Sequence, residues 1–252
     1  MIFMILGGLV LLFVIAPLAG MFLSVSPGEL ADTAAESEVS GSIWLTLFAS
    51  MGATLIFALG SVPLAYILAR RDFPLKQLVN GIVDLPIVIP HSAAGIALLG
   101  ILSKGTFLGD LAGRGGIEFV GGIAGIMAAM AFVSVPFLIN AARDGFAAVP
   151  VHLEKAALSL GASPARVFFT ISLPLAWRSV LSGLILMWAR GMSEFGAVLV
   201  IAYHPMITPV LIYERFGAFG LKYARPVSVL FILICLVFFI ALRVIAGRRS
   251  DA

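Results

Sequence analysis

Six long stretches of this sequence contain almost no charged residues, and this pattern limits the possible folds more than any other feature. A helix that crosses the hydrocarbon core of a membrane needs about 20 mostly apolar residues. Closed β-barrels show short alternating segments instead of long apolar runs. We therefore predict an all-α integral membrane protein that forms one transmembrane domain over residues 1–252. The expected spans cover residues 1–25, 43–69, 81–103, 119–142, 175–202 and 226–245.

The composition excludes several other classes of protein. Hydrophobic residues make up 61% of the 252 residues and charged residues only 12%, whereas soluble domains average about 25% charged residues. A soluble enzyme and a disordered chain are therefore excluded, and the single cysteine, Cys235, excludes a disulfide scaffold. We expect membrane lipid around the chain and no nucleic-acid partner, because the net charge is only +3 and the basic residues are scattered.

The basic residues predict how the chain is oriented, because loops rich in Lys and Arg stay in the cytoplasm. With six spans, both ends lie on the same side, and that side carries ten basic residues against five on the other. We therefore expect a multi-pass protein with both termini in the cytoplasm. The ten are Arg70, Arg71, Lys76, Arg143, Lys155, Arg166, Arg178, Arg243, Arg248 and Arg249, and the five are Lys104, Arg114, Arg215, Lys222 and Arg225.

The loop from residue 150 to residue 174 has the pattern of two short helices separated by a turn. Good helix formers precede Gly161, which can adopt the left-handed conformation that ends a helix, and Ser163 before Pro164 is typical of a new helix start. The first helix would have one largely apolar face, made of Leu153, Ala156, Ala157 and Leu160. This face must pack against the membrane surface, another loop or a partner protein, and its periodicity does not decide between them.

Two charged residues are predicted at membrane depth in the fifth span. Counted from Ser179, Arg190 lies about 17 Å along this helix, and Glu194 follows one turn later on the same face. A lone charge at this depth costs roughly 2.5–3.5 kcal/mol, so we expect the two side chains to form an ion pair. The pair either only ties the spans together, or it lines the solute pathway, where Arg190 would meet an anion.

The third span holds a second group of candidate residues. Pro86 and Pro90 each remove a backbone donor and disturb the helix, and His91 and Ser92 offer polar groups beside the freed carbonyls. Such an irregular segment either lines the solute pathway or is a structural kink, whose free backbone groups bond to Ser92 and to neighbouring spans. We expect no catalytic group and no metal site, because no two histidines have the spacing of metal ligands. The pathway or gate candidates are Asp84, Pro86, Pro90, His91, Ser92, Arg190, Ser193 and Glu194.

The sequence resembles the permeases of ABC importers, whose EAA motif reads E-A-A, three residues, G, nine residues, I, one residue, L-P. The positions that match it are Ala156, Ala157, Gly161, Ile171, Leu173 and Pro174. Lys155 occupies the position of the motif's Glu, and Glu154 lies one place earlier. Three further segments resemble the sulfate, molybdate and tungstate branch of this family: DLPIVIPHSAAGIALL from residue 84, ARGMSEFGA at 189–197 and TPVLIYERF at 208–216.

This resemblance implies the fold of type I (MetI-like) importer permeases, six transmembrane helices with a cytoplasmic coupling helix in the 150–174 loop. The coupling helix would insert into a separate ATPase. The residues expected to couple the two proteins are Glu154, Lys155, Ala156, Ala157, Gly161, Arg166, Ile171, Leu173 and Pro174. The resemblance also implies a homodimer in a prokaryotic cell membrane, two cytoplasmic ABC ATPase subunits and an extracytoplasmic oxyanion-binding protein.

We therefore predict a permease subunit, not an enzyme, that imports an oxyanion by alternating access. ATP and Mg²⁺ are expected on the ATPase and no cofactor on this chain, which has no G-x-x-x-x-G-K-[ST] motif. The substrate that the resemblance favours is molybdate or tungstate, with sulfate or another oxyanion as the alternative. A secondary transporter is the alternative from another class, but it would need paired broken helices in two related halves, and only the third span looks broken.

Overall fold

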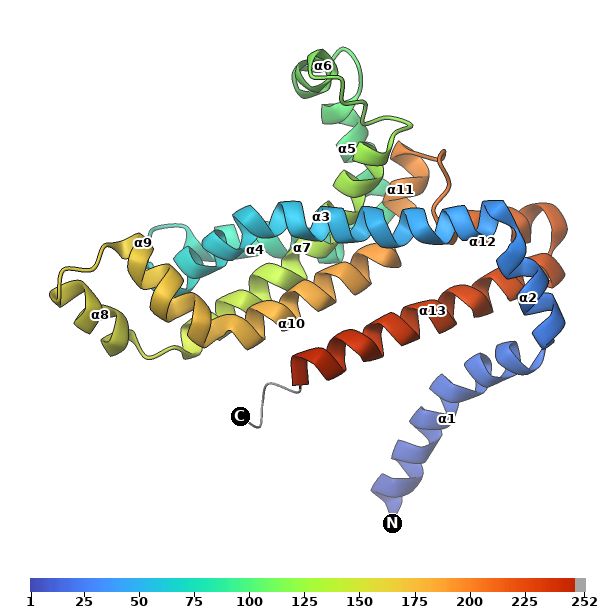
Figure 1. Cartoon of the computed structure of the whole chain (residues 1–252), viewed down its shortest axis with the longest axis horizontal. Helices are drawn as coiled ribbons and strands as arrows, with labels where there is room; N and C mark the ends of the chain where they lie inside the picture. Colours follow the sequence, from blue (N-terminus) through green and yellow to red (C-terminus); the bar gives the residue numbers. More distant parts are fainter. Residues whose placement is uncertain (248–252) are drawn as a thin grey trace. The chain divides into compact units, whose positions relative to one another are not determined.

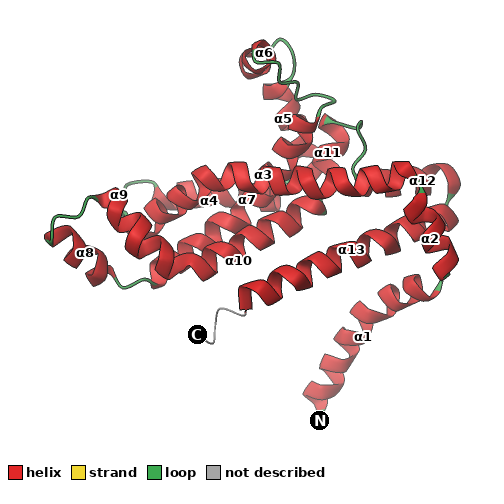
Figure 2. Ribbon diagram, viewed as in Figure 1, coloured by secondary structure: helices red, strands yellow, loops and turns green. Residues whose placement is uncertain are grey.

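The computed structural model describes residues 1–247, with side chains described through residue 241. This part of the chain is helical and contains no strand (Figure 2), which confirms the predicted all-α class. It separates into two compact units, residues 1–45 with 206–238, and residues 46–205 with the described residues from 239 to 247. Three residues used to predict the orientation have side chains outside the described residues, namely Arg243, Arg248 and Arg249.

The first unit begins with a helix that has no buried residue. This helix, α1, contains no charged residue, so it presents apolar side chains on all sides, as membrane-spanning helices do. Arg215 in α12 donates hydrogen bonds to Glu36 and to Glu38, the latter at 3.0 Å, and so ties α12 to the junction between α2 and α3. The elements of this unit are α1 (Ile2–Leu23), α2 (Pro27–Ala35), the start of α3 (Ser37–Arg70), α12 (Thr208–Phe219) and most of α13 (Leu221–Gly247).

The second unit is built around two long helices, α7 (Ile123–Ala148) and α10 (Leu173–Met192), which lie side by side (Figure 1). Their backbones approach closely because Gly145 faces Ser179, where a Cβ on the glycine would lie 2.3 Å from the serine Cβ. The remaining elements are the rest of α3, α4 (Lys76–Val88), α5 (His91–Leu102), α6 (Phe107–Arg114), α8 (Val151–Ser159), α9 (Pro164–Val167), the π-helical turn η1 (Phe168–Ser172) and α11 (Gly196–Ile201).

The predicted third span is a sharply bent pair of helices. Helices α4 and α5 meet at an angle of 114°. The break falls at Ile89, whose backbone is extended (ψ 145°), because the ring of the following proline disfavours the helical conformation there. Pro86 does not break the helix, contrary to the expectation that each of the two prolines disturbs it. It lies buried inside α4, which continues for two residues beyond it.

The predicted fifth span is also interrupted, which the sequence did not indicate. Helix α10 ends at Met192 and α11 begins at Gly196, with Ser193, Glu194 and Phe195 between them. At its other end the same span starts earlier than expected, because α9, η1 and α10 form one continuous helical run over Pro164–Met192. The α4–α5 pair is nevertheless the one bent pair among the candidate spans of the described residues, and the interruption at 193–195 separates the fifth span from the short helix α11.

The number of apolar helices agrees with the predicted six spans. Among the described residues, five helical segments are long and apolar enough to cross a membrane, and the α4–α5 pair gives a sixth if it counts as one span. The five are Ile2–Leu23, Ser37–Arg70, Ile123–Ala148, Pro164–Met192 and Leu221–Ala241.

Candidate functional site

The 150–174 loop folds as predicted, into two helical pieces separated by a turn. Helix α8 ends just before Gly161, which has a φ of +87°. Ser163 then caps α9 by accepting a hydrogen bond from the Arg166 amide at 3.3 Å, and Pro164 occupies the first helical turn. Only glycine adopts the left-handed conformation without strain, so the sequence determines the turn locally.

Glu154 points into the protein and is the one buried residue of α8. Its Oε1 accepts hydrogen bonds from Arg70 Nε at 2.9 Å and from the Ser172 hydroxyl at 2.7 Å, and its Oε2 accepts one from the Tyr66 hydroxyl at 3.2 Å. Burial raises the pKa of Glu154, but the hydrogen bonds and the charge of Arg70 outweigh burial and hold the pKa below its ordinary value. This carboxylate therefore has its partners within the chain.

The predicted apolar face of α8 is largely uncovered by the described part of the chain. Leu153 is 38% exposed and Leu160 is 89% exposed, and Leu158 beside them is 45% exposed. The other predicted coupling residues are mostly at the surface: Lys155, Ala156, Gly161, Arg166 and Pro174 are exposed, and Ala157, Ile171 and Leu173 are half-buried. The loop thus offers a surface that no segment within the described residues fills.

A second candidate site forms where α5, α10 and α11 meet. The predicted Arg190–Glu194 ion pair is present, with 3.2 Å between a guanidinium nitrogen and Oε2. His91, from the first turn of α5, joins it: its Nε2 lies 2.8 Å from Arg190 Nη2, and its Nδ1 lies 3.3 Å from Glu194 Oε2. The structure thus brings together the two segments that the sequence identified separately, although they lie 99 residues apart.

Within this cluster the acid is the deepest group. Glu194 is completely buried, whereas the side chains of Arg190 and His91 are 22% and 39% exposed. Glu194 Oε1 accepts a hydrogen bond from the Ala197 amide at 2.9 Å and so caps the start of α11. Ser193 is exposed and is the C-cap residue of α10. Its hydroxyl oxygen accepts a hydrogen bond from Arg190 Nη1 at 3.4 Å. The accessible edge of the cluster is consequently cationic or aromatic, and its anionic group lies beneath.

The remaining pathway candidates lie elsewhere on the α4–α5 pair. Asp84 accepts a hydrogen bond from Asn140 at 2.6 Å and joins α4 to α7. Pro86 is buried in α4, and Pro90 caps α5 immediately before the cluster. Ser92 is exposed beside His91. The hydrogen bond of Asp84 goes to Asn140 and not to the cluster.

Two glycines allow α5 and α11 to pack closely at the cluster, and the sequence did not single them out. A Cβ at Gly95 would lie 2.7 Å from Val200 Cβ and 2.9 Å from the Ala197 carbonyl oxygen. A Cβ at Gly196 would lie 2.8 Å from His91 Cβ. Helices α5 and α11, which run beside each other in Figure 1, can therefore approach only because these positions lack side chains.

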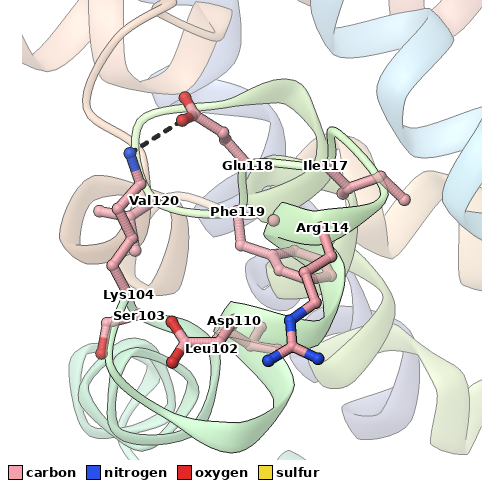
Figure 3. Close-up of a pocket in the computed structure, with 11 residues that line it drawn as sticks. Leu102, Ser103, Lys104, Asp110, Arg114, Ile117, Glu118, Phe119 and Val120 are labelled. Carbon is pink, nitrogen blue, oxygen red and sulfur yellow. Dashed lines mark hydrogen bonds and ion pairs between the residues drawn. The ribbon is translucent and has the colours of Figure 1, made fainter.

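A separate cavity of about 770 Å³ lies at the far end of α5, around α6 and the loop after it (Figure 3). Lys104 and Glu118 form a 2.8 Å ion pair across it, and this hydrogen bond lowers the pKa of Glu118. Asp110 and Arg114 also line the cavity, so both signs of charge are equally represented. It has no net preference for an anion. No group of three or more His, Cys, Asp or Glu side chains in the described residues could hold a metal ion.

Comparison with known proteins identifies the family. A model of the inner membrane component of binding-protein-dependent transport systems matches residues 61–251. The chain belongs to this family. Among curated relatives of this permease, the molybdate/tungstate transport system permease protein WtpB of Thermococcus kodakarensis is 42% identical over 99% of this chain and 96% of its own length. The sulfate transport system permease protein CysT of Synechococcus elongatus is 29% identical over 95% and 88%.

Solved structures show the same fold. A chain of a bacterial ABC transporter that imports the acidic polysaccharide alginate matches with a TM-score of 0.76 and 16% identity, over 99% of this permease and 95% of that chain. A chain of the MetNI methionine ABC transporter matches with a TM-score of 0.62 and 15% identity, over 83% and 93%. The predicted type I importer fold is confirmed. The named relatives are transporter permeases, so this chain is a permease subunit and not an enzyme.

Proposed function

We propose that this permease imports molybdate or tungstate as the membrane subunit of an ATP-driven importer. The observation that carries the substrate is the 42% identity to WtpB along almost the whole of both chains. A probable molybdenum ABC transporter permease of Haloferax volcanii is 32% identical over 91% of the chain. Sulfate permeases of Chlorokybus atmophyticus (a probable one) and Synechococcus elongatus are 33% and 29% identical, over 72% and 95% of the chain. Both are less similar to this chain than WtpB is, which favours molybdate or tungstate over sulfate.

The exposed face of α8 is the proposed contact for the ATPase. An apolar helix face that its own chain leaves uncovered favours burial against a partner, and the turn at Gly161 holds α8 at a defined angle to α9. ATP and Mg²⁺ would bind to the ATPase, with no cofactor on this chain. Of the predicted coupling residues, Glu154 would act from within the permease and the exposed ones at the contact.

The cluster of His91, Arg190 and Glu194 is the proposed contact for the passing oxyanion. A guanidinium donates paired hydrogen bonds that fit tetrahedral oxyanions. Glu194 beneath it offsets part of its charge, and a site on a transport route must also release its solute. Arg190 would therefore hold the anion weakly, with Ser193 and Ser92 at the accessible edge.

The assembly that we propose contains two copies of this permease, two ATPase subunits and an extracytoplasmic binding protein, with both termini of the permease in the cytoplasm of a prokaryotic cell. A chain of the alginate transporter solved together with its substrate-bound periplasmic protein matches this permease with a TM-score of 0.74. ATP-driven closure of the ATPases would move both α8 helices and open the pathway outward, and hydrolysis would reset it.

Reconstitution in liposomes tests this function directly. The permease is combined with an ABC ATPase and an oxyanion-binding protein from the same organism, and uptake of molybdate, tungstate and sulfate is measured with and without ATP. We expect ATP-dependent uptake of molybdate and tungstate that excess sulfate does not block. Equal uptake of sulfate would contradict the substrate, and uptake by the permease alone would contradict the ATP-driven mechanism.

A further inference from the structure

We propose that Glu154 and Arg70 form a joint that fixes α8 to the end of α3, so that α3 moves together with the two helices that flank the loop. The inference rests on the proposed function, in which α8 receives the motion of the ATPase. It gives Glu154 a positioning role inside the permease instead of a contact with the partner. It also adds a third helix, distant in sequence, to those that the partner can move.

The contacts of these two residues reach four elements. Arg70, the last residue of α3, donates from Nε to Glu154 at 2.9 Å and from Nη2 to the Val149 carbonyl at 2.8 Å, directly after the end of α7. Ser172 in η1 donates to the same carboxylate at 2.7 Å. One ion pair therefore connects the ends of α3 and α7 with α8 and with the helical run that leads into α10.

Burial makes this connection stiff. The side chains of Arg70 and Glu154 are 10% and 9% exposed, and removal of one partner would leave the other charge buried and unpaired, which is strongly unfavourable. Beneath the pair, the Tyr66 ring contacts Phe146 and Phe168 edge-on, with centroids 5.3 Å and 5.1 Å apart. Tyr66 also donates to Glu154, so the polar joint and the apolar packing share a residue.

Helix α8 has no other buried attachment. Apart from Glu154 its residues are exposed or half-buried, and short non-helical segments connect it to α7 and α9. Without the joint, α8 would be held by these connections and by its limited packing against α9 and η1, so it could tilt more independently of the spans. A partner that pushed on it would then move the loop and not the membrane helices.

The first test uses the reconstituted importer and separates binding from coupling. We expect Arg70→Ala to retain the ATPase through purification and to hydrolyse ATP, while molybdate uptake per ATP falls by about tenfold because the joint is lost with one buried charge unpaired. Arg71→Ala, which changes the exposed neighbouring arginine, serves as the matched control and should match the wild type. The exchange Arg70→Glu with Glu154→Arg should recover part of the uptake.

The second test needs no ATPase, so it separates this inference from the proposed function. A spin label at Leu160, introduced by Leu160→Cys in a Cys235→Ala background, reports the mobility of the loop in the purified permease. Arg70→Ala and Glu154→Gln should each increase its mobility, with size-exclusion profiles as the check on folding. Unchanged mobility in well-folded variants would overturn the joint. Failure of the wild-type permease to retain any ATPase would instead overturn the proposed function.

Discussion

Two buried glutamates in the second unit pair with arginines, yet their surroundings differ. Glu154 accepts hydrogen bonds at both oxygens, from Arg70, Ser172 and Tyr66. Glu194 is buried more deeply, but only its Oε1 accepts a hydrogen bond, whereas Oε2 lies 3.2 Å from Arg190 without hydrogen-bond geometry. The same pair of residue types therefore makes a saturated joint in one place and an under-satisfied cluster in the other.

This difference matches the proposed roles. A saturated buried network has one favourable arrangement and resists change. Arg190 is held to Glu194 Oε2 by charge attraction without a hydrogen bond, and charge attraction is less directional than a hydrogen bond. Arg190 can therefore turn toward an anion while it stays beside Glu194, whereas Arg70 cannot turn without breaking its hydrogen bond to Glu154. The first site is suited to transmit movement and the second to exchange partners.

The largest effect is expected at the under-satisfied site. Arg190→Ala would leave the fully buried Glu194 without its positive partner, which costs roughly 3–5 kcal/mol, and would remove the proposed anion contact. We expect a much lower melting temperature in detergent and loss of molybdate uptake, with Arg190→Lys retaining stability better than uptake. Normal uptake in Arg190→Ala would show that this cluster is only structural and remove the functional half of the comparison.

A smaller effect is expected from forcing α5 and α11 apart. Gly95→Ala would place a methyl 2.7 Å from Val200 Cβ and 2.9 Å from a backbone oxygen, and such overpacking costs about 1–3 kcal/mol. Gly100→Ala in the same helix meets nothing within 4 Å and is the control. The Gly95 variant should impair uptake without changing the mobility of a label at Leu160. If the Gly95 variant changed both the uptake and the mobility of the Leu160 label, the Glu154 joint and the Glu194 cluster would be structurally coupled.

Position 161, in the turn beside the joint, has room for a larger side chain, but its backbone conformation disfavours β-branched residues. A Cβ at Gly161 would meet nothing within 4 Å, but its φ of +87° strains any β-branched residue. We expect Gly161→Val to cost about 1–2 kcal/mol and Gly161→Asn considerably less, because asparagine tolerates the left-handed region. Retention of the ATPase by each purified variant measures the effect. Equal retention in both would mean that the angle of α8 is not set by this turn.

The smallest effect is expected from pH. Because Glu154 has a pKa held below its ordinary value, the joint contributes fully above that ordinary value, and its contribution is lost only as the pH falls through the lowered pKa. Between about pH 8 and pH 5 the mobility of the Leu160 label should stay constant, and it should rise only in stronger acid. The Glu154→Gln variant, already mobile, should show no such rise. A rise near pH 6 would identify another titrating group.

Local patterns explain what could be predicted from the sequence. Gly161, Ser163 and Pro164 define a helix stop and a helix start within four positions, and the Arg190–Glu194 pair follows from one helical turn. Long apolar runs define the spans by length alone. Each of these features depends on residues close together in the chain, so one sequence is sufficient to find them.

The features that were missed depend on distant partners. Arg70 lies 84 residues before Glu154, and nothing near Glu154 in the sequence indicates that it is buried. The break after Met192 contains neither Pro nor Gly. It coincides with Glu194, whose side chain accepts a hydrogen bond from the Ala197 amide and so caps α11. Gly95 matters only because Val200 and Ala197 face it. Predicting these contacts requires the packing of the helices, which periodicity does not supply.

The order of synthesis affects the bent α4–α5 pair, because α5 is made before its packing partner α11. His91 is synthesised 99 residues before Arg190. During insertion α5 can therefore pack against α6 and α7, but the face that Gly95 presents to α11 stays without its partner. The half-span becomes native only after α11 arrives. We therefore expect chains truncated before α11 (Gly196–Ile201) to leave the close-packing face of α5 uncovered, and to be degraded in the membrane faster than chains that include α11.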